Sequence, residues 1–316
     1  MLQSPTYHQE YIAPAALDWI NDQPFSKQYE DIYYTADGTD EVHRIYLKPS
    51  ALLERKDLGA CINVGELGFG SGLNFAITAT ELLQQTNKHL HFISFEAHPL
   101  DYEAWQKIAP TRASLQIYRV LADNPPPLLT GWHRRSFANG RVQLSVYHGN
   151  ALDGLQDLAK RQRQPVDAWF LDGFSPPKNP DMWDLNILSA IADNSTQGTT
   201  VGSFTSAGAV RRGLEALGFA MRKVDQQPIK RSSLAGTLVA NGAKQRQSTP
   251  QRVSVFGAGI AGCTVARHLA DQGVQVQIFD PTGVASGGSK MDVSALHCRL
   301  LGDSSPGAEF RARAFH

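Results

Sequence analysis

The chain has 316 residues, of which 42% are hydrophobic and 19% are charged, and its 30 basic residues balance 30 acidic ones. This composition excludes a globally disordered protein, and the length suits about two domains of average size. A neutral chain has no general attraction for polyanions, so any nucleic acid would have to be bound by a local basic patch.

The cysteines and the N-terminal residues argue against a metal-binding, secreted or membrane protein. The three cysteines contain no C-x-x-C pair, so we expect reduced thiols and no metal site. The N-terminus does not read as a signal peptide, and the chain contains no apolar run of ~18 residues. We therefore expect a cytoplasmic protein without membrane contact.

The N-terminal segment contains two short runs of alternating polarity, at residues 31–34 and 42–47. The sequence Thr35-Ala36-Asp37-Gly38 lies between them. An Asp-Gly pair between strand-like runs is typical of a hairpin, so the sequence predicts an N-terminal β-hairpin appendage.

From residue 61 onward, strand-like and helix-like segments alternate. Such alternation is typical of an α/β fold in which helices cover both faces of a parallel sheet. The predicted strands are residues 61–66, 91–96, 142–148, 166–171, 199–205 and 236–240, and the predicted helices are residues 73–83, 151–161 and 207–217.

A glycine-rich loop follows the first of these strands. Gly68, Gly70 and Gly72 are spaced G-x-G-x-G rather than in the G-x-G-x-x-G pattern of a dinucleotide site, and Glu66 precedes them. An acid at this place would repel a pyrophosphate, but it suits the ammonium or sulfonium of S-adenosylmethionine. The alternative is a tight turn without a ligand.

Polar residues also end the next two predicted strands. Glu96 stands where ribose hydroxyls are held in sheets of this kind. Asn150 could bond an adenine edge, or it could only cap the following helix. With the glycine loop, these positions favour a Rossmann-like sheet of the S-adenosylmethionine-dependent methyltransferase class.

The segment after the fourth strand carries the candidate substrate site. Asp172 ends the strand, and a stiff, proline-rich stretch follows. A carboxylate there could orient a substrate amine and accept its proton, while Phe174 and Trp183 offer flat surfaces for an aromatic substrate. A structural turn capped by Asp172 is the alternative.

A second strand–loop–helix–strand unit starts at residue 253, after a polar linker at residues 241–252. Gly257, Gly259 and Gly262 form the full dinucleotide fingerprint, and Asp280 ends the next strand in position to hold a ribose. We expect residues 1–240 to form the first domain and residues 253–316 the truncated N-terminal part of a second domain.

Several long segments together resemble the bacterial bifunctional family that makes 5-methylaminomethyl-2-thiouridine in tRNA. They are ELGFGSGLNF, HFISFE, VDAWFLDGFSPPKNPDMW and FTSAGAVRRGLEALGF, and DIYYTADGTDEVHRIYL resembles the family's N-terminal hairpin. The resemblance covers residues 25–240 and resumes over residues 253–316. It implies methylation of the C5-aminomethyl group of a wobble uridine with S-adenosylmethionine, beside an FAD-dependent oxidase half.

The resemblance also implies roles for individual residues. The S-adenosylmethionine contacts would be Glu66, Gly68, Gly70, Gly72, Asn74, Glu96 and Asn150, and the amine site would be Asp172 and Phe174. The tRNA contacts would be Lys178, Arg211, Arg212, Lys230 and Arg231, and the FAD contacts would be Gly257, Gly259, Gly262 and Asp280. Asn150 departs from the usual Asp, and residues 226–233 keep only two basic residues of a richer family stretch.

Two other functions stay open on the sequence alone. The chain could methylate a small amine, or it could be a tRNA-binding fragment without catalysis. We expect a monomer whose partner is tRNA with a modified wobble uridine. The short second unit would hold FAD weakly or not at all and would not oxidise a substrate by itself.

Overall fold

The computed structural model describes residues 11–34, 38–161, 164–228, 230–240, 244–245 and 250–291, without the side chains of residues 230 and 231. The chain divides into two compact units, of which the larger comprises Ile12–Thr249 with Asp271–Gly273. The smaller one comprises Pro250–Ala270 and the described residues from Val274 onward. Most of the predicted linker at residues 241–252 lies outside the described residues.

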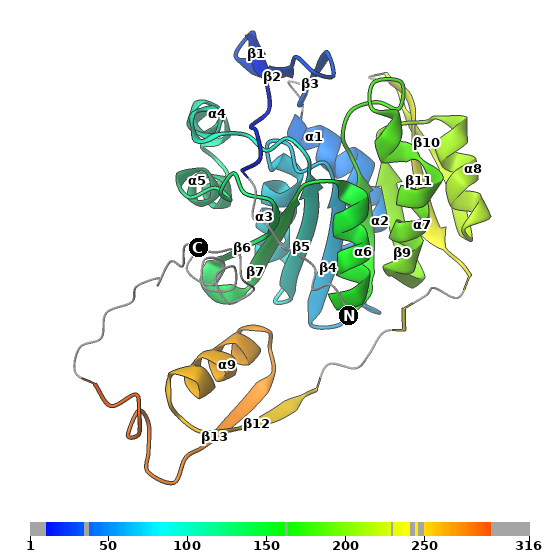
Figure 1. Cartoon of the computed structure of the whole chain (residues 1–316). Coiled ribbons are helices and arrows are strands. Elements are labelled where there is room, and N and C mark those ends of the chain that lie inside the picture. Colours follow the sequence, from blue (N-terminus) through cyan, green and yellow to red (C-terminus); the bar gives the residue numbers. More distant parts are fainter. Residues whose placement is uncertain are drawn as a thin grey trace, which may run out of the picture. The chain divides into compact units, whose positions relative to one another are not determined.

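An eight-stranded sheet forms the centre of the larger unit, in the order β10-β11-β9-β8-β4-β5-β7-β6 (Figure 1). The five strands β9, β8, β4, β5 and β7 run parallel, whereas β6 and the β10–β11 pair run antiparallel to their neighbours. The strands are β4 (Cys61–Leu67), β5 (His89–Glu96), β6 (Gly131–Phe137), β7 (Val142–His148), β8 (Val166–Leu171), β9 (Ser195–Ser203), β10 (Phe219–Gln226) and β11 (Lys230–Leu238).

The predicted α/β fold with a parallel sheet is therefore confirmed for the five central strands, and antiparallel strands extend the sheet at both sides. The sequence analysis missed β6 and β10, the two edge strands, whose sequences GWHRRSF and FAMRKVDQ contain several charged residues. An edge strand is half exposed and does not need the continuous apolar run of a central strand. β8, by contrast, is buried at every position and has the bounds that the sequence predicts.

Two hydrophobic clusters cover the two faces of the sheet. Side chains alternate along a strand, and in β5 Phe92 belongs to one cluster while Ile93 belongs to the other. The first cluster includes buried residues of α3 (Leu73–Gln85), α4 (Tyr102–Ile108) and α5 (Gln116–Asp123). The second includes residues of α6 (Ala151–Arg161), α7 (Leu185–Asp193) and α8 (Gly208–Ala216), so helices cover both faces as predicted.

The N-terminal appendage exists, but only the first of the two predicted runs contributes to it, through the short strand β3 (Asp31–Ile32). The hairpin joins β1 (Leu17–Ile20) to β2 (Gln23–Ser26), with β3 alongside. The connecting residues Asn21 and Asp22 both have positive φ, as the favoured two-residue hairpin turns require.

The predicted strand at residues 42–47 is wrong, because this stretch is helical. It spans the end of α1 (Gly38–Val42) and the π-helical turn η1 (His43–Leu47), which continues into α2 (Lys48–Ser50). Val42, Ile45 and Tyr46 are buried in the first cluster. Their spacing of three and four residues fits one helical face, and that burial outweighs the local alternation.

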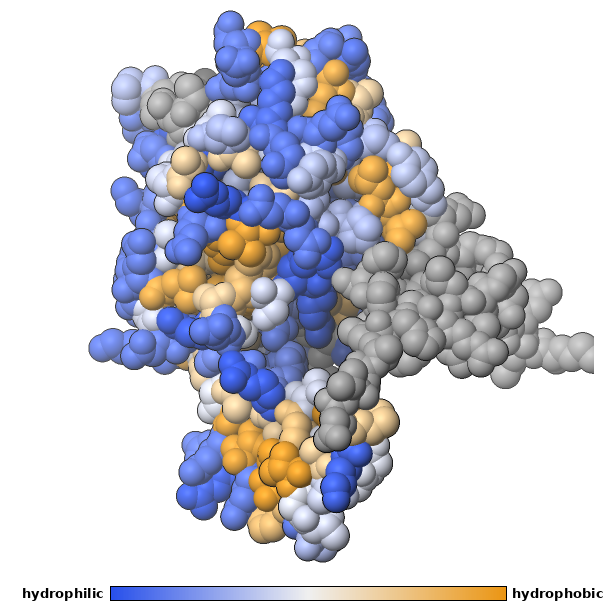
Figure 2. Space-filling view, turned by 90° about the vertical axis from the view of Figure 1, so that its left-hand side faces the viewer, coloured by the Kyte–Doolittle hydropathy of each residue, from blue (hydrophilic) through white to orange (hydrophobic). Residues whose placement is uncertain are grey.

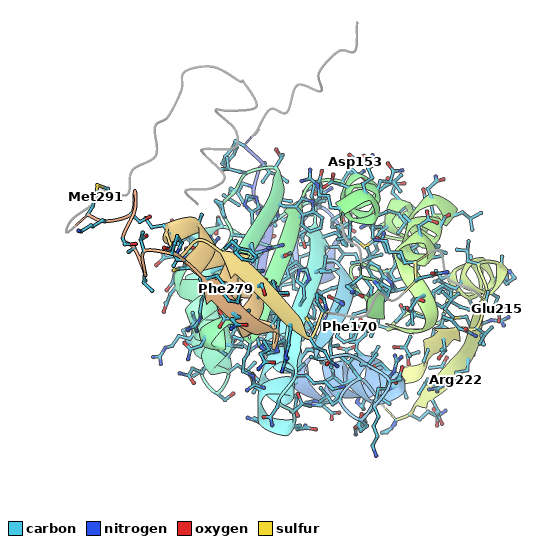
Figure 3. All side chains as sticks on the ribbon, turned by 90° about the horizontal axis from the view of Figure 1, so that it is seen from below. Asp153, Phe170, Glu215, Arg222, Phe279 and Met291 are labelled. Carbon is cyan, nitrogen blue, oxygen red and sulfur yellow. The ribbon has the colours of Figure 1, made fainter. Side chains whose placement is uncertain are left out.

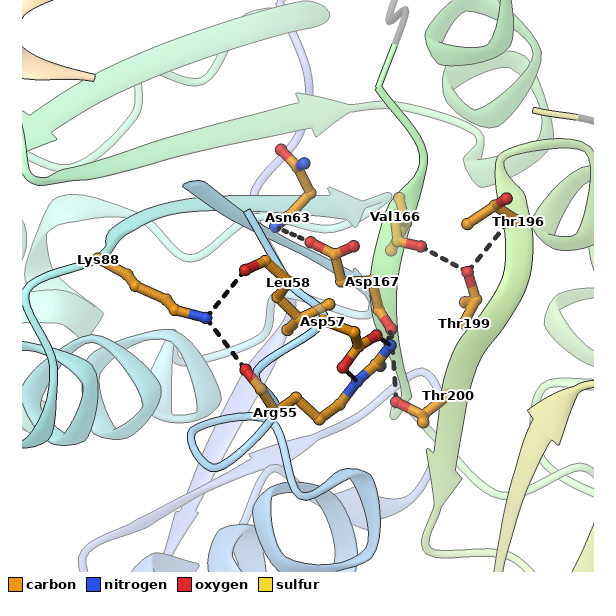
Figure 4. Close-up of polar contacts among 10 residues, drawn as sticks. All are labelled: Arg55, Asp57, Leu58, Asn63, Lys88, Val166, Asp167, Thr196, Thr199 and Thr200. Carbon is orange, nitrogen blue, oxygen red and sulfur yellow. Dashed lines mark hydrogen bonds and ion pairs between the residues drawn. The ribbon is translucent and has the colours of Figure 1, made fainter. Parts of the chain in front are cut away.

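A polar network at the amino ends of the parallel strands fixes β4 against β8 (Figure 4). The buried Asp167 carboxylate accepts a hydrogen bond from the backbone amide of Asn63 at 2.8 Å, and the backbone carbonyl of Asp167 accepts one from the Arg55 guanidinium at 3.3 Å. Arg55 also pairs with Asp57, and Lys88 donates to two carbonyls of the same loop. The network holds the strand register at the edge opposite the glycine loop.

Gly65 provides a direct test of packing between β4 and β8. A Cβ there would overlap the indole ring of Trp169, which is fully buried and fixed by a hydrogen bond to Ser195. Because the ring has nowhere to move, we expect Gly65→Ala to lower the free energy of unfolding by about 1–3 kcal/mol. Urea denaturation would measure this, with Gly59→Ala as the control, since no atom lies within 4 Å of its added methyl. Equal stability of the two variants would contradict the packing argument.

The smaller unit contains the predicted strand–helix–strand element. β12 (Arg252–Phe256) and β13 (Gln275–Phe279) pair in parallel, and α9 (Ile260–Asp271) connects them. The Phe256 and Phe279 rings stack with centroids 5.4 Å apart and are 82% and 41% exposed. Apolar groups are visible on the surface of this unit in Figure 2. Figure 3 labels Phe279 on β13 of this unit, and Phe170 on β8 of the central sheet in the larger unit.

Among the described residues, no helix combines the length and apolar character needed to span a bilayer. The same residues contain no group of three potential metal-ligating side chains. Cys61 and Cys263 are free thiols, and burial raises the pKa of Cys61 to about 12. Cys298 lies outside the described residues.

Candidate cofactor and substrate site

The loop after β4 has the backbone that its three glycines permit. Gly68, Gly70 and Gly72 have φ values of +81°, +51° and +69°, which L side chains rarely adopt. A Cβ on Gly68 would lie 3.1 Å from the Cα of Gly173, and one on Gly72 would lie 3.1 Å from the Phe69 ring. The loop therefore runs against the turn that follows β8.

The amides of this loop are largely used inside the protein. Gly68 and Phe69 donate to the Phe95 carbonyl, Gly70 donates to Glu96 at 2.7 Å, and Gly72 donates to the Phe69 carbonyl. A phosphate site needs backbone amides that point at the ligand. The loop therefore suits a ligand without phosphate groups, as the G-x-G-x-G spacing predicts.

Glu66 lies beneath the loop rather than on its surface. Its side chain is fully buried and accepts hydrogen bonds from Ser94 at 2.6 Å and Asn74 at 2.9 Å. Burial, and then the nearby Asp172 carboxylate, raise the pKa of Glu66 well above its usual value. Direct contact of Glu66 with a ligand cation stays a prediction, whereas its support of Asn74 is visible.

Asn74 connects two carboxylates. Its Nδ2 donates to Glu66 at 2.9 Å and to Asp172 at 2.7 Å, and the residue is only 7% exposed. The polar chain thus runs from β4 through α3 to the end of β8. The sequence resemblance marks Asn74 as a cofactor contact, and that role too stays a prediction.

Asp172 is held in place from several sides. Its carboxylate accepts from Asn74 and from the Gly173 amide at 2.8 Å. Burial raises its pKa to about 6, although these hydrogen bonds oppose the shift. The pKa of the Tyr46 hydroxyl is raised well above its usual value, first by the burial of Tyr46 and then by the negative charge of the nearby Asp172. Nothing in the sequence indicated Tyr46 or Ser94, because their roles depend on contacts between distant elements.

The next two strand ends carry Glu96 and Asn150. Glu96 accepts from Gly70 at 2.7 Å and from the His98 amide at 2.8 Å, and burial raises its pKa. It remains partly exposed beside the glycine loop. Asn150 is exposed, and its side chain accepts from the Leu152 amide at 2.8 Å, so the helix-capping role is confirmed and the adenine contact stays a prediction.

The aromatic side chains after β8 divide into one structural and one surface residue. Trp183 is 7% exposed, packs against Phe204 and donates to the Phe174 carbonyl at 3.0 Å. The interpretation of Trp183 as a substrate surface is therefore wrong. Phe174 is partly exposed and stacks on Tyr29 with centroids 4.4 Å apart.

The predicted basic contacts lie in different settings. Lys178 donates to the Glu30 carbonyl at 2.6 Å and pairs with Asp31 at 3.4 Å, so its amine already has partners. Arg211 pairs with Glu215 along α8 at 2.7 Å, and Arg212 is exposed on the same helix. Lys230 and Arg231 belong to β11, but their side chains lie outside the described residues.

The second glycine loop has the tight geometry of its fingerprint. Gly257 has a φ of +103°, and a Cβ on Gly262 would overlap the Gly257 carbonyl oxygen. Asp280 accepts from the amides of Ala258, Thr282 and Gly283, which lower its pKa. Gly259 lies beside the hydroxyl of Ser289, and this hydroxyl accepts a hydrogen bond from the backbone amide of Ile260. Ile260 begins α9, and the start of this helix is the place where the fingerprint would hold a pyrophosphate.

Comparisons with known proteins agree with both parts of the fold. Residues 114–239 match a family described as S-adenosyl-L-methionine-dependent methyltransferase, and residues 255–293 match the NAD(P)-binding Rossmann-like domain. The crystal structure of MNMC2 from Aquifex aeolicus has a TM-score of 0.57 and 24% identity, with 77% of this chain and 75% of that chain covered. At that identity the likeness concerns the fold alone.

Curated relatives of this chain carry the name tRNA 5-methylaminomethyl-2-thiouridine biosynthesis bifunctional protein MnmC, and two of them serve as examples. The one from Pseudoalteromonas translucida is 35% identical over an alignment of 320 residues with gaps, which covers 92% of this chain and 47% of the relative. The one from Marinobacter nauticus is 37% identical over 316 residues, covering 95% and 49%. The chain spans about half the length of these relatives. It is a homologue of the tRNA 5-methylaminomethyl-2-thiouridine biosynthesis bifunctional proteins, with an S-adenosyl-L-methionine-dependent methyltransferase domain followed by a Rossmann-like segment.

Proposed function

We propose that this protein methylates the aminomethyl nitrogen on C5 of a tRNA wobble uridine, with S-adenosylmethionine as the methyl donor. The observation that carries the proposal is the position of Asp172. A carboxylate with a pKa of about 6 directly follows β8, beside a glycine loop whose amides are largely occupied. Such an acid is ionised at neutral pH and can accept a proton there.

The residues present fit S-adenosylmethionine, which supplies an electrophilic methyl group when bound. Glu96, partly exposed at the end of β5, would hold the ribose hydroxyls, and Asn150 would face the adenine. Gly68, Gly70 and Gly72 would allow close approach of the backbone. Glu66 would act through Asn74, whose side chain it holds in place beside Asp172.

The chemistry required of the protein is orientation and proton removal. Methyl transfer forms an N–C bond and breaks an S–C bond, and the substrate nitrogen must lose one proton to end as a neutral amine. The Asp172 carboxylate would align the nitrogen and take that proton, while Asn74 keeps the carboxylate fixed. Phe174 would line the same site.

The remaining assignments follow from the homology and the fold. Arg211 and Arg212 lie on α8, which begins just after the carboxyl end of β9, and would contact tRNA phosphates together with Lys178, Lys230 and Arg231. Gly257, Gly259, Gly262 and Asp280 would contact FAD. We propose a cytoplasmic monomer, as suits an enzyme acting on tRNA.

The test is transfer of labelled methyl from S-adenosylmethionine to tRNA from cells that make the aminomethyl but not the methylaminomethyl uridine. We expect one methyl group per wobble uridine, located by nuclease digestion. Tight tRNA binding without label would favour the non-catalytic fragment. Label on a free amine but not on tRNA would favour a small-molecule methyltransferase.

A further inference from the structure

Two tyrosines of the N-terminal segment cover Phe174. Tyr29 and Phe174 stack with centroids 4.4 Å apart and an angle of 23° between their planes. Tyr33 meets Phe174 edge-on, with centroids 5.4 Å apart and an angle of 82°. The aromatic side chain that the sequence places on the site surface is therefore in contact with two rings that no sequence pattern singles out.

This aromatic group borders the site directly. Phe174 is two residues from Asp172, and the Tyr33 ring lies 3.2 Å from the place that a Cβ on Gly70 would take. Burial is the main cause that raises the pKa of Tyr29 and of Tyr33, and the charge of Glu96 is the second cause for both. Their hydroxyls therefore lie near the same carboxylate. The rings thus form a wall between the glycine loop and the turn after β8.

The segment that carries Tyr29 is fastened by backbone hydrogen bonds in addition to the contacts of the Tyr29 ring with Phe174 and His98. Lys178 holds the Glu30 carbonyl at 2.6 Å, and the Tyr29 amide donates to Ser26 at 3.3 Å. The Tyr29 side chain itself is only partly buried. Its ring can therefore rotate away from Phe174 while these two hydrogen bonds stay in place.

We propose that Tyr29 and Phe174 form a stacking subsite for the planar base that carries the reactive amine. In this structure the Tyr29 ring takes the place of that base. Unpaired RNA bases are recognised by stacking on aromatic side chains, and every base offers a flat face. A base between the two rings needs about twice the ~3.5–4 Å contact distance, so the Tyr29 ring must move outward by about 3 Å.

The inference rests on the proposed function, because the ring that it accommodates is that of the tRNA uridine. The alternative is that no base binds there, with Tyr29 only anchoring the N-terminal segment. An anchor needs apolar bulk, whereas a stacking partner needs an aromatic ring and loses its value when the ligand has no base. That difference can be measured.

The experiment uses the full chain saturated with S-adenosylhomocysteine and two anticodon stem-loop RNAs. One carries 5-aminomethyluridine at the wobble position, and the other carries an abasic ribose there. Fluorescence anisotropy gives the affinity of each RNA for the wild type, Tyr29→Ala, Tyr29→Leu and Tyr29→Phe. Tyr102→Ala is the matched control, because Tyr102 is 57% exposed on α4.

The wild type, Tyr29→Phe and Tyr102→Ala should bind the base-containing RNA at least about 10-fold more tightly than the abasic RNA. Tyr29→Ala and Tyr29→Leu should lose most of this preference, with unchanged affinity for S-adenosylhomocysteine. A preference that survives in Tyr29→Leu, or is absent in the wild type, overturns the stacking subsite.

Methyl transfer to the first RNA is measured separately. A wild-type binding preference that depends on Tyr29, without methyl transfer, would contradict the proposed function and still support the stacking subsite.

Discussion

Asp172→Asn should lower kcat for methyl transfer by about 10²- to 10⁴-fold, the range that general-base catalysis contributes. Asparagine keeps the size of the side chain and can still contact Asn74, but it cannot accept a proton. Because the pKa of Asp172 is raised to about 6, wild-type kcat should rise as the carboxyl ionises and level off above neutral pH.

The pH profile separates proton acceptance from a purely structural role. The residual activity of Asp172→Asn should lack the rise near pH 6, and its affinity for S-adenosylmethionine should stay within a few fold of the wild type. Asp153→Asn, on the exposed face of α6, is the control and should keep the wild-type profile. An Asp172→Asn variant with the wild-type rate would remove Asp172 from the mechanism.

Glu66→Gln should stabilise the chain at alkaline pH. Burial raises the pKa of Glu66 well above its usual value, so the folded chain binds this proton more tightly than the unfolded chain does. Stability is then fully present below the unfolded pKa of ~4.3 and is lost as the pH rises toward the folded value, by ~1.4 kcal/mol for each unit of difference. Asp172, with its raised pKa, contributes in the same direction.

Urea denaturation from pH 4 to pH 9 would show the effect. The wild type should lose stability across this range, while Glu66→Gln should have a flatter profile and exceed the wild type at the upper end. Glutamine can keep both contacts, since its oxygen accepts from Asn74 and its amide donates to the Ser94 hydroxyl. Parallel profiles would mean that Glu66 ionises normally in the folded protein.

The sequence predicted those parts of the fold that depend on local signals. β8 is a short apolar run, α6 is amphipathic, and the glycines at 68, 70 and 72 mark a backbone that other residues rarely adopt. It failed where burial from distant elements decides the outcome. Residues 42–47 alternate in polarity, yet Ile45 and Tyr46 are buried as part of a helix.

The candidate site shows the same division. Asp172 and Glu96 could be located because acids at strand ends follow from the strand pattern. The bridge from Asn74 to Asp172, and the stacking of Tyr29 on Phe174, join residues 98 and 145 positions apart in the chain. No local pattern marks such pairs.

The charged edge strands β6 and β10 have a consequence for behaviour at high concentration. Unpaired edge strands offer a template on which another copy can add a strand, which is a common start of aggregation. Arg134 on β6, and Lys223 on β10, are exposed at these two edges, with Arg222 beside Lys223. Two copies meeting edge to edge would bring like charges together, so the residues that concealed these strands from sequence analysis also protect the sheet from growing.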